Sequence, residues 1–140
     1  MRIIVIYLLV VAQLYTLNIT RYLPKAQNST LLKSVKRGKK IYTKKCKICH
    51  KADGKGKINK YPPLAQSDFL VKYRAKSIRA IKFGITDSIV VNGIVYHRIM
   101  KKVNLNHQEI ADVMNYISNS WGNKNQKIVT AEEVVNIKKD

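Results

Sequence analysis

The sequence predicts an all-α domain that carries one small β-hairpin. Apolar residues recur at helical spacing from Ile110 to Trp121, residues 32–46 favour a helix, and Asn92-Gly93 lies between two β-branched runs. A chain of 140 residues is long enough for one domain with a sizeable core and too short for two domains of ordinary size. These observations predict a single domain in which helices supply most of the core.

The first residues have the pattern of a targeting segment. Arg2 precedes an apolar stretch, residues 3–12, which has about the length of a signal-peptide core and is shorter than the roughly 20 residues of a membrane-spanning helix. A buried first strand fits this order of residues less well. We expect residues 1–17 to be a signal peptide or an N-terminal anchor of a periplasmic protein, and the polar residues 18–31 to be a linker.

The first predicted helix, residues 32–46, contains a glycine in its interior. Gly38 lowers the stability of the helix and therefore indicates that another backbone passes close by. After the helix, the breakers in Asp53-Gly-Lys-Gly56 and Tyr61-Pro-Pro-Leu64 predict a loop over residues 51–66.

Short elements follow this loop. We expect one short helix after Ser67 and another around residues 77–83, which ends at Gly84. The β-branched residues on either side of Asn92-Gly93 then predict a hairpin over residues 89–96.

The last main helix has a clear beginning. Asn106 is followed three residues later by Glu109, which is the spacing of a capping box, and the apolar repeat continues until Gly122. The polar residues 124–140 are predicted to be a C-terminal tail with one weak helical stretch near Glu132.

The charge balance is strongly basic. The chain has 27 Lys and Arg against 8 Asp and Glu, a formal net charge of +19, and Asp53 is the one acid between Arg21 and Lys60. Such a surface attracts an acidic protein, nucleic acid or an anionic membrane, whereas the simplest interpretation is a solvated face combined with compositional bias. Nucleic acid is disfavoured because the basic run lacks interleaved aromatic residues and a binding motif.

The motif with the clearest chemistry is Cys46-Lys-Ile-Cys49-His50, the C-x-x-C-H pattern of covalent haem attachment. Two thiols on one turn can add to the two vinyl groups of one porphyrin edge, and the next residue can bind the iron. A structural zinc site would need further Cys or His residues, a thioredoxin-like pair would need a βαβ context, and a disulfide would not account for His50. We therefore expect one haem c per chain, attached at Cys46 and Cys49 and ligated by His50.

A second iron ligand has to come from elsewhere in the chain. The candidates are Met100, Met114, His97 and His107. Met114 lies on the apolar stripe of the last helix, which predicts a core residue, and His107 lies in the first turn of that helix, where we expect it to be exposed. We prefer Met100 as the ligand, because a methionine directly before Lys101 and Lys102 would otherwise be an exposed apolar side chain without a function. His97 is the alternative.

Several further stretches resemble one family. From about residue 32 to residue 123, covering two-thirds of the chain, the sequence resembles class I bacterial cytochromes c, which bind one haem through His and Met. Besides the haem motif, Tyr96 and Met100, the matching stretches are Arg37-Gly-Lys-Lys-Ile-Tyr42, Asp53-Gly-Lys-Gly56, Tyr61-Pro-Pro-Leu64, Val91-Asn-Gly93, Glu109-Ile-Ala-Asp-Val-Met-Asn-Tyr116 and Ser120-Trp-Gly-Asn123.

This resemblance implies a cytochrome c domain at residues 32–123, in which three main helices surround the haem. It implies that the first and last helices cross at Gly38, with Tyr42, Val113 and Tyr116 around the crossing. It also implies that the Pro62 carbonyl accepts a hydrogen bond from His50, and that Leu64 packs on the haem face.

The sequence departs from the family pattern at two positions. The residue after the haem-motif histidine is usually Gly and is Lys51 here, and the ligand Met is usually followed by Pro and is followed here by Lys101. Both changes add positive charge near the expected haem edge, where Lys47 and Lys102 also lie.

With His and Met on the iron, no coordination position is open for substrate, and we expect an electron carrier rather than an enzyme. We expect acidic redox proteins (an oxidase, a reductase or a dehydrogenase) as partners, and contact with a membrane only through an uncleaved N-terminal segment. The alternative is a dedicated cytochrome c subunit of a larger dehydrogenase or reductase, which the extra length of residues 124–140 favours.

Overall fold

The computed structural model describes residues 6, 11, 13, 29–125 and 127–139, and the chain divides into two units, residues 1–32 and 33–140. In the first unit, every described residue is helical. The predicted signal peptide or anchor and most of the predicted linker lie outside the described residues, although residues 29–31 at the end of that linker are helical. Among the described residues, no helix is both long and apolar enough to span a membrane.

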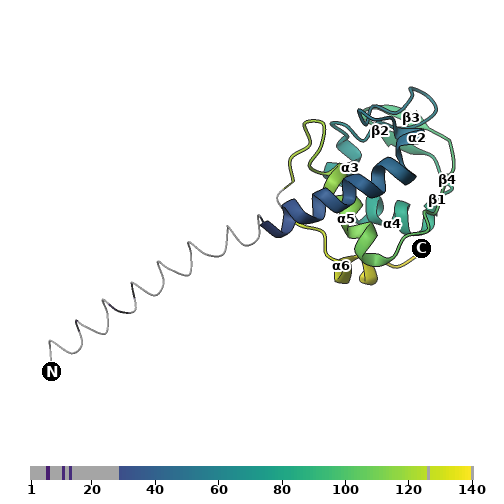
Figure 1. Ribbon diagram of the computed structural model, residues 1–140. Helices are drawn as coiled ribbons and strands as arrows, with labels where there is room; N and C mark the ends of the chain where they lie inside the picture. The colour runs from purple at the N-terminus through teal and green to yellow at the C-terminus, as the bar shows by residue number, and fades with distance from the viewer. Residues whose placement is uncertain (1–5, 7–10, 12, 14–28, 126, 140) are drawn as a thin grey trace. The chain divides into compact units, whose positions relative to one another are not determined.

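The second unit is built mainly of helices (Figure 1). Its first helix covers residues 33–45. The other helices and the strands are α2 (Lys47–His50), α3 (Asp68–Lys72), α4 (Arg74–Phe83), β1 (Gly84–Ile85), β2 (Ile89–Val91), β3 (Ile94–Tyr96), β4 (Met100–Lys101), α5 (His107–Ile117) and α6 (Ala131–Asn136). This order matches the predicted succession of helix, loop, two short helices, hairpin and long helix.

The capping box at the start of α5 is confirmed. The Asn106 side chain accepts from the Glu109 backbone N–H at 2.9 Å, and the Glu109 carboxylate accepts from the Asn106 N–H at the same distance. At its other end, α5 stops at Ile117, five residues before the predicted end at Gly122. The Asn123 amide caps the helix by donating to the Ile117 carbonyl at 2.7 Å, so residues 118–121 form a turn instead.

The helix at residues 33–45 crosses α5 at Gly38, as predicted (Figure 1). A Cβ at Gly38 would overlap the carbonyl of Asp112 and would lie 2.8 Å from Cβ of Tyr116. Tyr42, one turn further along, is buried with its ring centroid 5.3 Å from that of Tyr116. Only glycine allows the two backbones to approach this closely.

A buried polar network fixes this crossing, and the sequence pattern did not predict it. The Asp112 carboxylate accepts from the Ser34 hydroxyl and from both Nε and Nη2 of Arg37, each at 2.6 Å. Asn115 donates to the Ser34 hydroxyl at 2.9 Å. A buried carboxylate is tolerated only with such partners, so the network ties the register of the first helix to that of α5.

The strands form two short antiparallel pairs. The predicted hairpin is present as β2 and β3, with Ile89 opposite Tyr96 and with Asn92-Gly93 at the turn in positive φ. The second pair, β1 with β4, was not predicted, because its strands are two residues long and fifteen residues apart in sequence. It sets Met100 opposite Ile85 and so fixes the position of the methionine.

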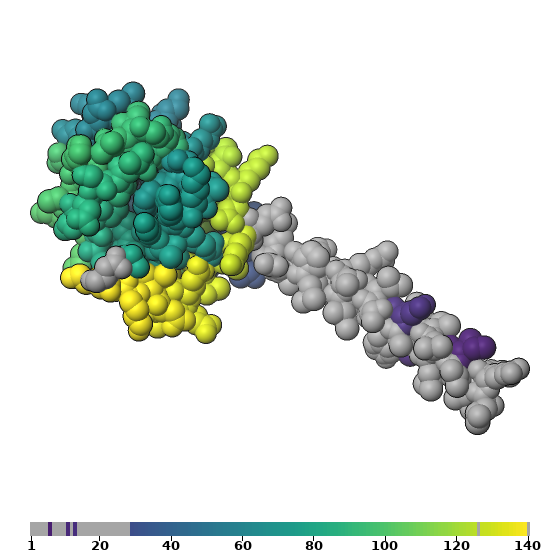
Figure 2. Space-filling model, turned by 180° about the vertical axis from the view of Figure 1, so that it is seen from behind, coloured from purple at the N-terminus to yellow at the C-terminus, as the bar shows by residue number. Residues whose placement is uncertain are grey.

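The segment that the structure describes at residues 127–139 is not a separate tail, which corrects the domain boundary predicted at residue 123. Val129 and Val134 are buried in the same core as α5, and Asn115 exchanges two hydrogen bonds with the Val129 backbone at 2.7 and 2.9 Å. From α4, Arg74 pairs with Glu133 at 2.6 Å, and the Lys82 ammonium caps α6. Figure 2 shows this yellow segment lying directly against the teal helices.

Candidate functional site

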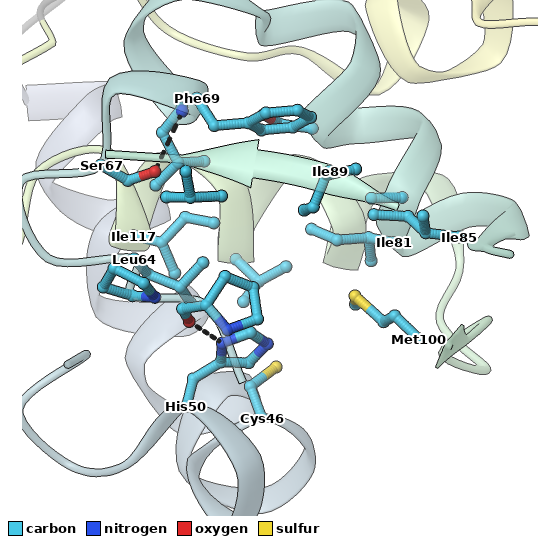
Figure 3. Close-up of a pocket in the computed structure, with 17 residues that line it drawn as sticks. Cys46, His50, Leu64, Ser67, Phe69, Ile81, Ile85, Ile89, Met100 and Ile117 are labelled. Carbon is cyan, nitrogen blue, oxygen red and sulfur yellow. Dashed lines mark hydrogen bonds between the residues drawn. The ribbon is translucent and has the colours of Figure 1, made fainter. Parts of the chain in front are cut away.

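An apolar cavity lies between α2, α4, α5 and the two strand pairs (Figure 3). Side chains of seventeen residues line it, and most of them are aliphatic or aromatic. A wider, partly polar opening, which we call the mouth, continues from it. Six residues line both the cavity and the mouth, namely Cys46, His50, Pro62, Ile85, Ile89 and Met100.

The haem motif forms a single tight turn at the edge of this space. The backbone N–H groups of Cys49 and His50 both donate to the Cys46 carbonyl, at 3.2 and 3.0 Å. The turn therefore brings both thiols and the imidazole to one side, where Cys46 and His50 line the cavity and Cys49 lines the mouth.

His50 is buried and held by one hydrogen bond. Its Nδ1 lies 3.0 Å from the Pro62 carbonyl oxygen. Burial lowers the pKa of His50, although the bond to Pro62 acts in the opposite direction. The ring is therefore neutral at pH 7 and donates from Nδ1, which leaves the lone pair of Nε2 turned toward the cavity (Figure 3).

The loop that supplies Pro62 is held close by Gly56. A Cβ at Gly56 would lie 2.7 Å from the Pro62 carbonyl oxygen, and Gly56 has a φ of 65°. Its N–H donates to the His50 carbonyl at 3.0 Å. The second glycine of the Asp53-Gly-Lys-Gly56 motif thus allows the carbonyl of one loop to reach the histidine of the preceding turn.

Of the four candidates for a second ligand, Met100 alone lines the cavity, and Figure 3 shows its sulfur turned into the same space as His50. Met114 is 1% exposed within the core, as predicted for a packing residue. His97 and His107 are exposed, and the Nδ1 of His97 lies 2.7 Å from the Ser88 hydroxyl.

A profile of the family described as cytochrome c matches residues 35–121. The chain belongs to the cytochrome c family. It is 36% identical over 106 residues to cytochrome c-552 of Thermus thermophilus, a match that covers 69% of this chain and 80% of that protein. It is also 32% identical over 115 residues to the cytochrome c subunit of a quinone alcohol dehydrogenase of Gluconacetobacter polyoxogenes, covering 72% of this chain and 22% of that subunit.

The chain therefore spans about a fifth of the length of the dehydrogenase subunits that it matches. A shorter match, 50% identical over 36 residues, is to the gluconate 2-dehydrogenase cytochrome c subunit of Pantoea cypripedii. Together these findings identify a class I c-type cytochrome with a helical cytochrome c fold, which carries covalently bound haem c and transfers electrons.

The residues of the cavity fit haem c better than the alternative groups. Burial, and secondarily Cys49, raise the pKa of the Cys46 thiol to about 11, so at neutral pH it is a neutral thiol at the edge of an apolar cavity. The two cysteines are not joined to each other. Among the described residues, no group of three or more His, Cys, Asp or Glu could hold a metal ion by itself.

The mouth of this cytochrome c has basic and apolar side chains together. Lys45, Lys60, Arg98 and Lys101 line it together with the exposed Ile99. Of the four lysines expected at the haem edge, only Lys101 lines the mouth. The sequence did not predict the other three basic residues, Lys45, Lys60 and Arg98. Folding brings them together from three separate segments, and no local pattern marks them.

Proposed function

We propose that Cys46 and Cys49 bind the haem through thioethers and that His50 and Met100 are its axial ligands. One observation supports this most strongly. The free nitrogen of His50, at the end of α2, and the sulfur of Met100, in β4, are both turned into one apolar cavity (Figure 3). Cys46 also lines this cavity. Histidine and methionine are the ligand pair of electron-transferring cytochromes c.

The neighbouring residues hold these groups in place. The Pro62 carbonyl fixes the tautomer and orientation of His50, which makes its Nε2 the more basic nitrogen. Leu64, which lines the cavity, would pack on one haem face. The helix at residues 33–45, α4 and α5 would surround the haem as the three main helices, and their apolar side chains would exclude water from it.

Haem c, when bound, supplies a one-electron change between ferric and ferrous iron. The chain's own contribution would be to supply both protein ligands of the iron, His50 and Met100, and to keep the surroundings apolar. Two protein ligands leave no open position for a substrate, so the chain would act as a carrier and not as an enzyme by itself. A thioether ligand favours ferrous iron and would therefore raise the reduction potential of the haem.

The mouth is where we propose that electrons enter and leave. Its basic side chains would meet an acidic surface on the redox partner, and the exposed Ile99 would add an apolar contact. Complexes of electron-transfer proteins are small and short-lived, so charge would mainly set the rate of encounter. The oxidase, reductase or dehydrogenase partner would lie in the periplasm, where c-type haem is attached.

A dedicated subunit of a dehydrogenase is the second candidate, favoured by the names of the relatives in Gluconacetobacter polyoxogenes and Pantoea cypripedii. The length of residues 124–140 no longer favours it, because most of that segment packs on its own domain. Gel filtration of native extract separates the two candidates: a free carrier elutes near the 16.1 kDa of the chain, and a subunit elutes with its complex.

Acid–acetone extraction of the denatured holoprotein tests the attachment. The haem should stay with the chain, and the holoprotein should contain no free thiol. Cys46→Ala or Cys49→Ala should reduce the yield of holoprotein sharply, whereas Ser67→Ala, also at the cavity, should not. Haem that is extracted freely, or two titratable thiols in the holoprotein, would refute covalent attachment.

A further inference from the structure

Residues 127–139, which we call the C-terminal strap, are tied to α4 by charged side chains of that helix. At the start of α4, the Arg74 guanidinium donates to both carboxylate oxygens of Glu133, at 2.6 and 2.7 Å. The same guanidinium donates to the backbone carbonyls of Lys127 and Ile128, each at 2.9 Å. A planar guanidinium that makes four such bonds allows one geometry, so these bonds fix the position of the strap along α4.

Lys82 makes a second connection near the other end of α4. Its ammonium donates to three carbonyls of the strap at 2.7, 3.1 and 2.9 Å, those of Val134, Val135 and Ile137. These carbonyls lie at the C-terminal end of α6, where the helix itself leaves carbonyls without a partner. An ammonium has three hydrogens, so the strap can accept all of them. Between the two connections, Arg79 donates to the Lys138 carbonyl at 3.1 Å.

The helix that the strap binds also forms a wall of the haem cavity. Ser77, Ala80 and Ile81 of α4 line the cavity, at positions between Arg74 and Lys82. One set of side chains on α4 therefore contacts the cavity, and another set contacts the strap. A displacement of the strap would free α4 to move relative to the cavity.

The position of Met100 depends on the end of α4. β1 follows α4 without a break, and its Ile85 lies opposite Met100 in the strand pair. Just beyond β4, the Val103 N–H donates to the Ile81 carbonyl of α4 at 3.1 Å. A Cβ at Gly84 would lie 2.6 Å from the Met100 carbonyl oxygen, so the two strands are in close contact. Two paired strands of two residues are not stable alone, so Met100 stays in place only while α4 does.

Given the proposed ligation by Met100, we propose that the C-terminal strap keeps this methionine on the iron by holding α4 in place. Arg74 and Lys82 are then positioning residues, which act on the ligand through α4 and β1. A soft thioether binds ferric iron weakly, so a local movement of α4 and β1 would open the sixth position before the whole domain unfolds. The strap therefore sets how often the iron is open to other ligands.

Binding of imidazole to the ferric holoprotein measures this opening, because imidazole reaches the iron only when Met100 has left it. The strap variant combines Arg74→Gln with Lys82→Met. These substitutions remove the two charges and keep much of the apolar length of each side chain. In every variant, the temperature at which the sulfur-to-iron band disappears is also compared with the temperature of unfolding by circular dichroism.

The control variant combines Arg37→Gln with Lys72→Met. It loses the same charge as the strap variant, together with two ion pairs, those with Asp112 and Asp68. Neither pair involves α4 or the strap. The control variant therefore measures what a lower charge and a lower global stability do by themselves.

The strap variant should bind imidazole about tenfold more tightly than the wild type, because the apparent affinity follows the population of the open state. Tenfold corresponds to about 1.4 kcal/mol, which the loss of hydrogen bonds to two charged groups is sufficient to supply. The band of the strap variant should disappear below its temperature of unfolding. The control variant should lose band and fold together and should stay within about threefold of the wild-type affinity.

Equal imidazole affinities in the two variants would overturn the proposal, because global stability alone would then explain both. A strap variant with the affinity of the wild type would overturn it as well. If the strap variant does not retain haem, Lys82→Met alone should still bind imidazole about threefold more tightly than Lys72→Met alone, and equal affinities of these two would overturn the proposal. A wild-type holoprotein without the sulfur-to-iron band would instead overturn the ligation by Met100, and the role of the strap with it.

Discussion

Lys51 occupies a backbone conformation that is essentially restricted to glycine. Its φ is 66° and its ψ is 168°. The Tyr42 hydroxyl donates to its carbonyl at 2.6 Å, and its own N–H donates to the Lys47 carbonyl at 2.9 Å, so hydrogen bonds on both sides hold this conformation. The family pattern has glycine here, directly after the haem-motif histidine.

We predict that Lys51→Gly increases the free energy of unfolding by about 1 kcal/mol. A side chain in this region of φ and ψ costs about 1–3 kcal/mol. Glycine relieves that strain, but its greater conformational entropy in the unfolded chain offsets about 0.4–1 kcal/mol of the gain in stability. Urea unfolding of the holoprotein, followed by circular dichroism, measures the difference.

Lys51→Ala is the matched control, because it removes the same charge and keeps the Cβ that causes the strain. Its stability should stay within about 0.5 kcal/mol of the wild type. The reasoning would be refuted if the Gly variant were no more stable than the Ala variant. A gain shared equally by both variants would point to relief of charge repulsion instead.

Three other predictions follow from packing and charge. Gly38→Ala should destabilise the holoprotein by about 2 kcal/mol despite the better helix propensity of alanine, because the added Cβ overlaps the backbone of α5; a rise in the melting temperature would contradict the close crossing. The pKa of Glu133 is lowered, mainly by the hydrogen bond from Arg74. The pair therefore stabilises the fold at pH values above about 4.3, the ordinary pKa of a glutamate, and this stabilisation is lost as the pH falls through the lowered pKa. Glu133→Gln should therefore cost about 1 kcal/mol at pH 7 and nothing near pH 2, as measured by urea unfolding at both. The rate of electron transfer to an acidic partner should fall steeply as salt rises toward 0.1 M, where screening acts over about 10 Å, and Lys60→Gln with Lys101→Gln should flatten that dependence; a rate that is insensitive to salt would exclude an acidic partner.

Local patterns were sufficient for the elements that local interactions create. The capping box of Asn106 and Glu109 joins residues three apart, and Asn92-Gly93 turns a hairpin by its own backbone preference. The haem motif likewise brings Cys46 and His50 together within one turn. In each case, residues within one turn of each other in the sequence determine the local structure.

Features that depend on distant residues were predicted poorly. The Ser34–Asp112 bond joins residues 78 apart, and Arg74 reaches Glu133 across 59. The packing of residues 127–139 depends on such contacts, so a polar composition alone suggested a C-terminal tail. Gly38 was the exception, because a helical glycine signals a close neighbour even when that neighbour cannot be identified.

The sixth ligand is the most direct test of the proposed site. The oxidised spectrum of the holoprotein should contain the sulfur-to-iron charge-transfer band toward the red, which reports a methionine ligand. Met100→Ala should abolish this band, lower the reduction potential and open the iron to added ligands. Met114→Ala should keep the band and cost about 2–5 kcal/mol of core packing. If Met100→Ala left spectrum and potential unchanged while His97→Ala altered both, the iron would have two histidine ligands, and the account given for Met100 would be wrong.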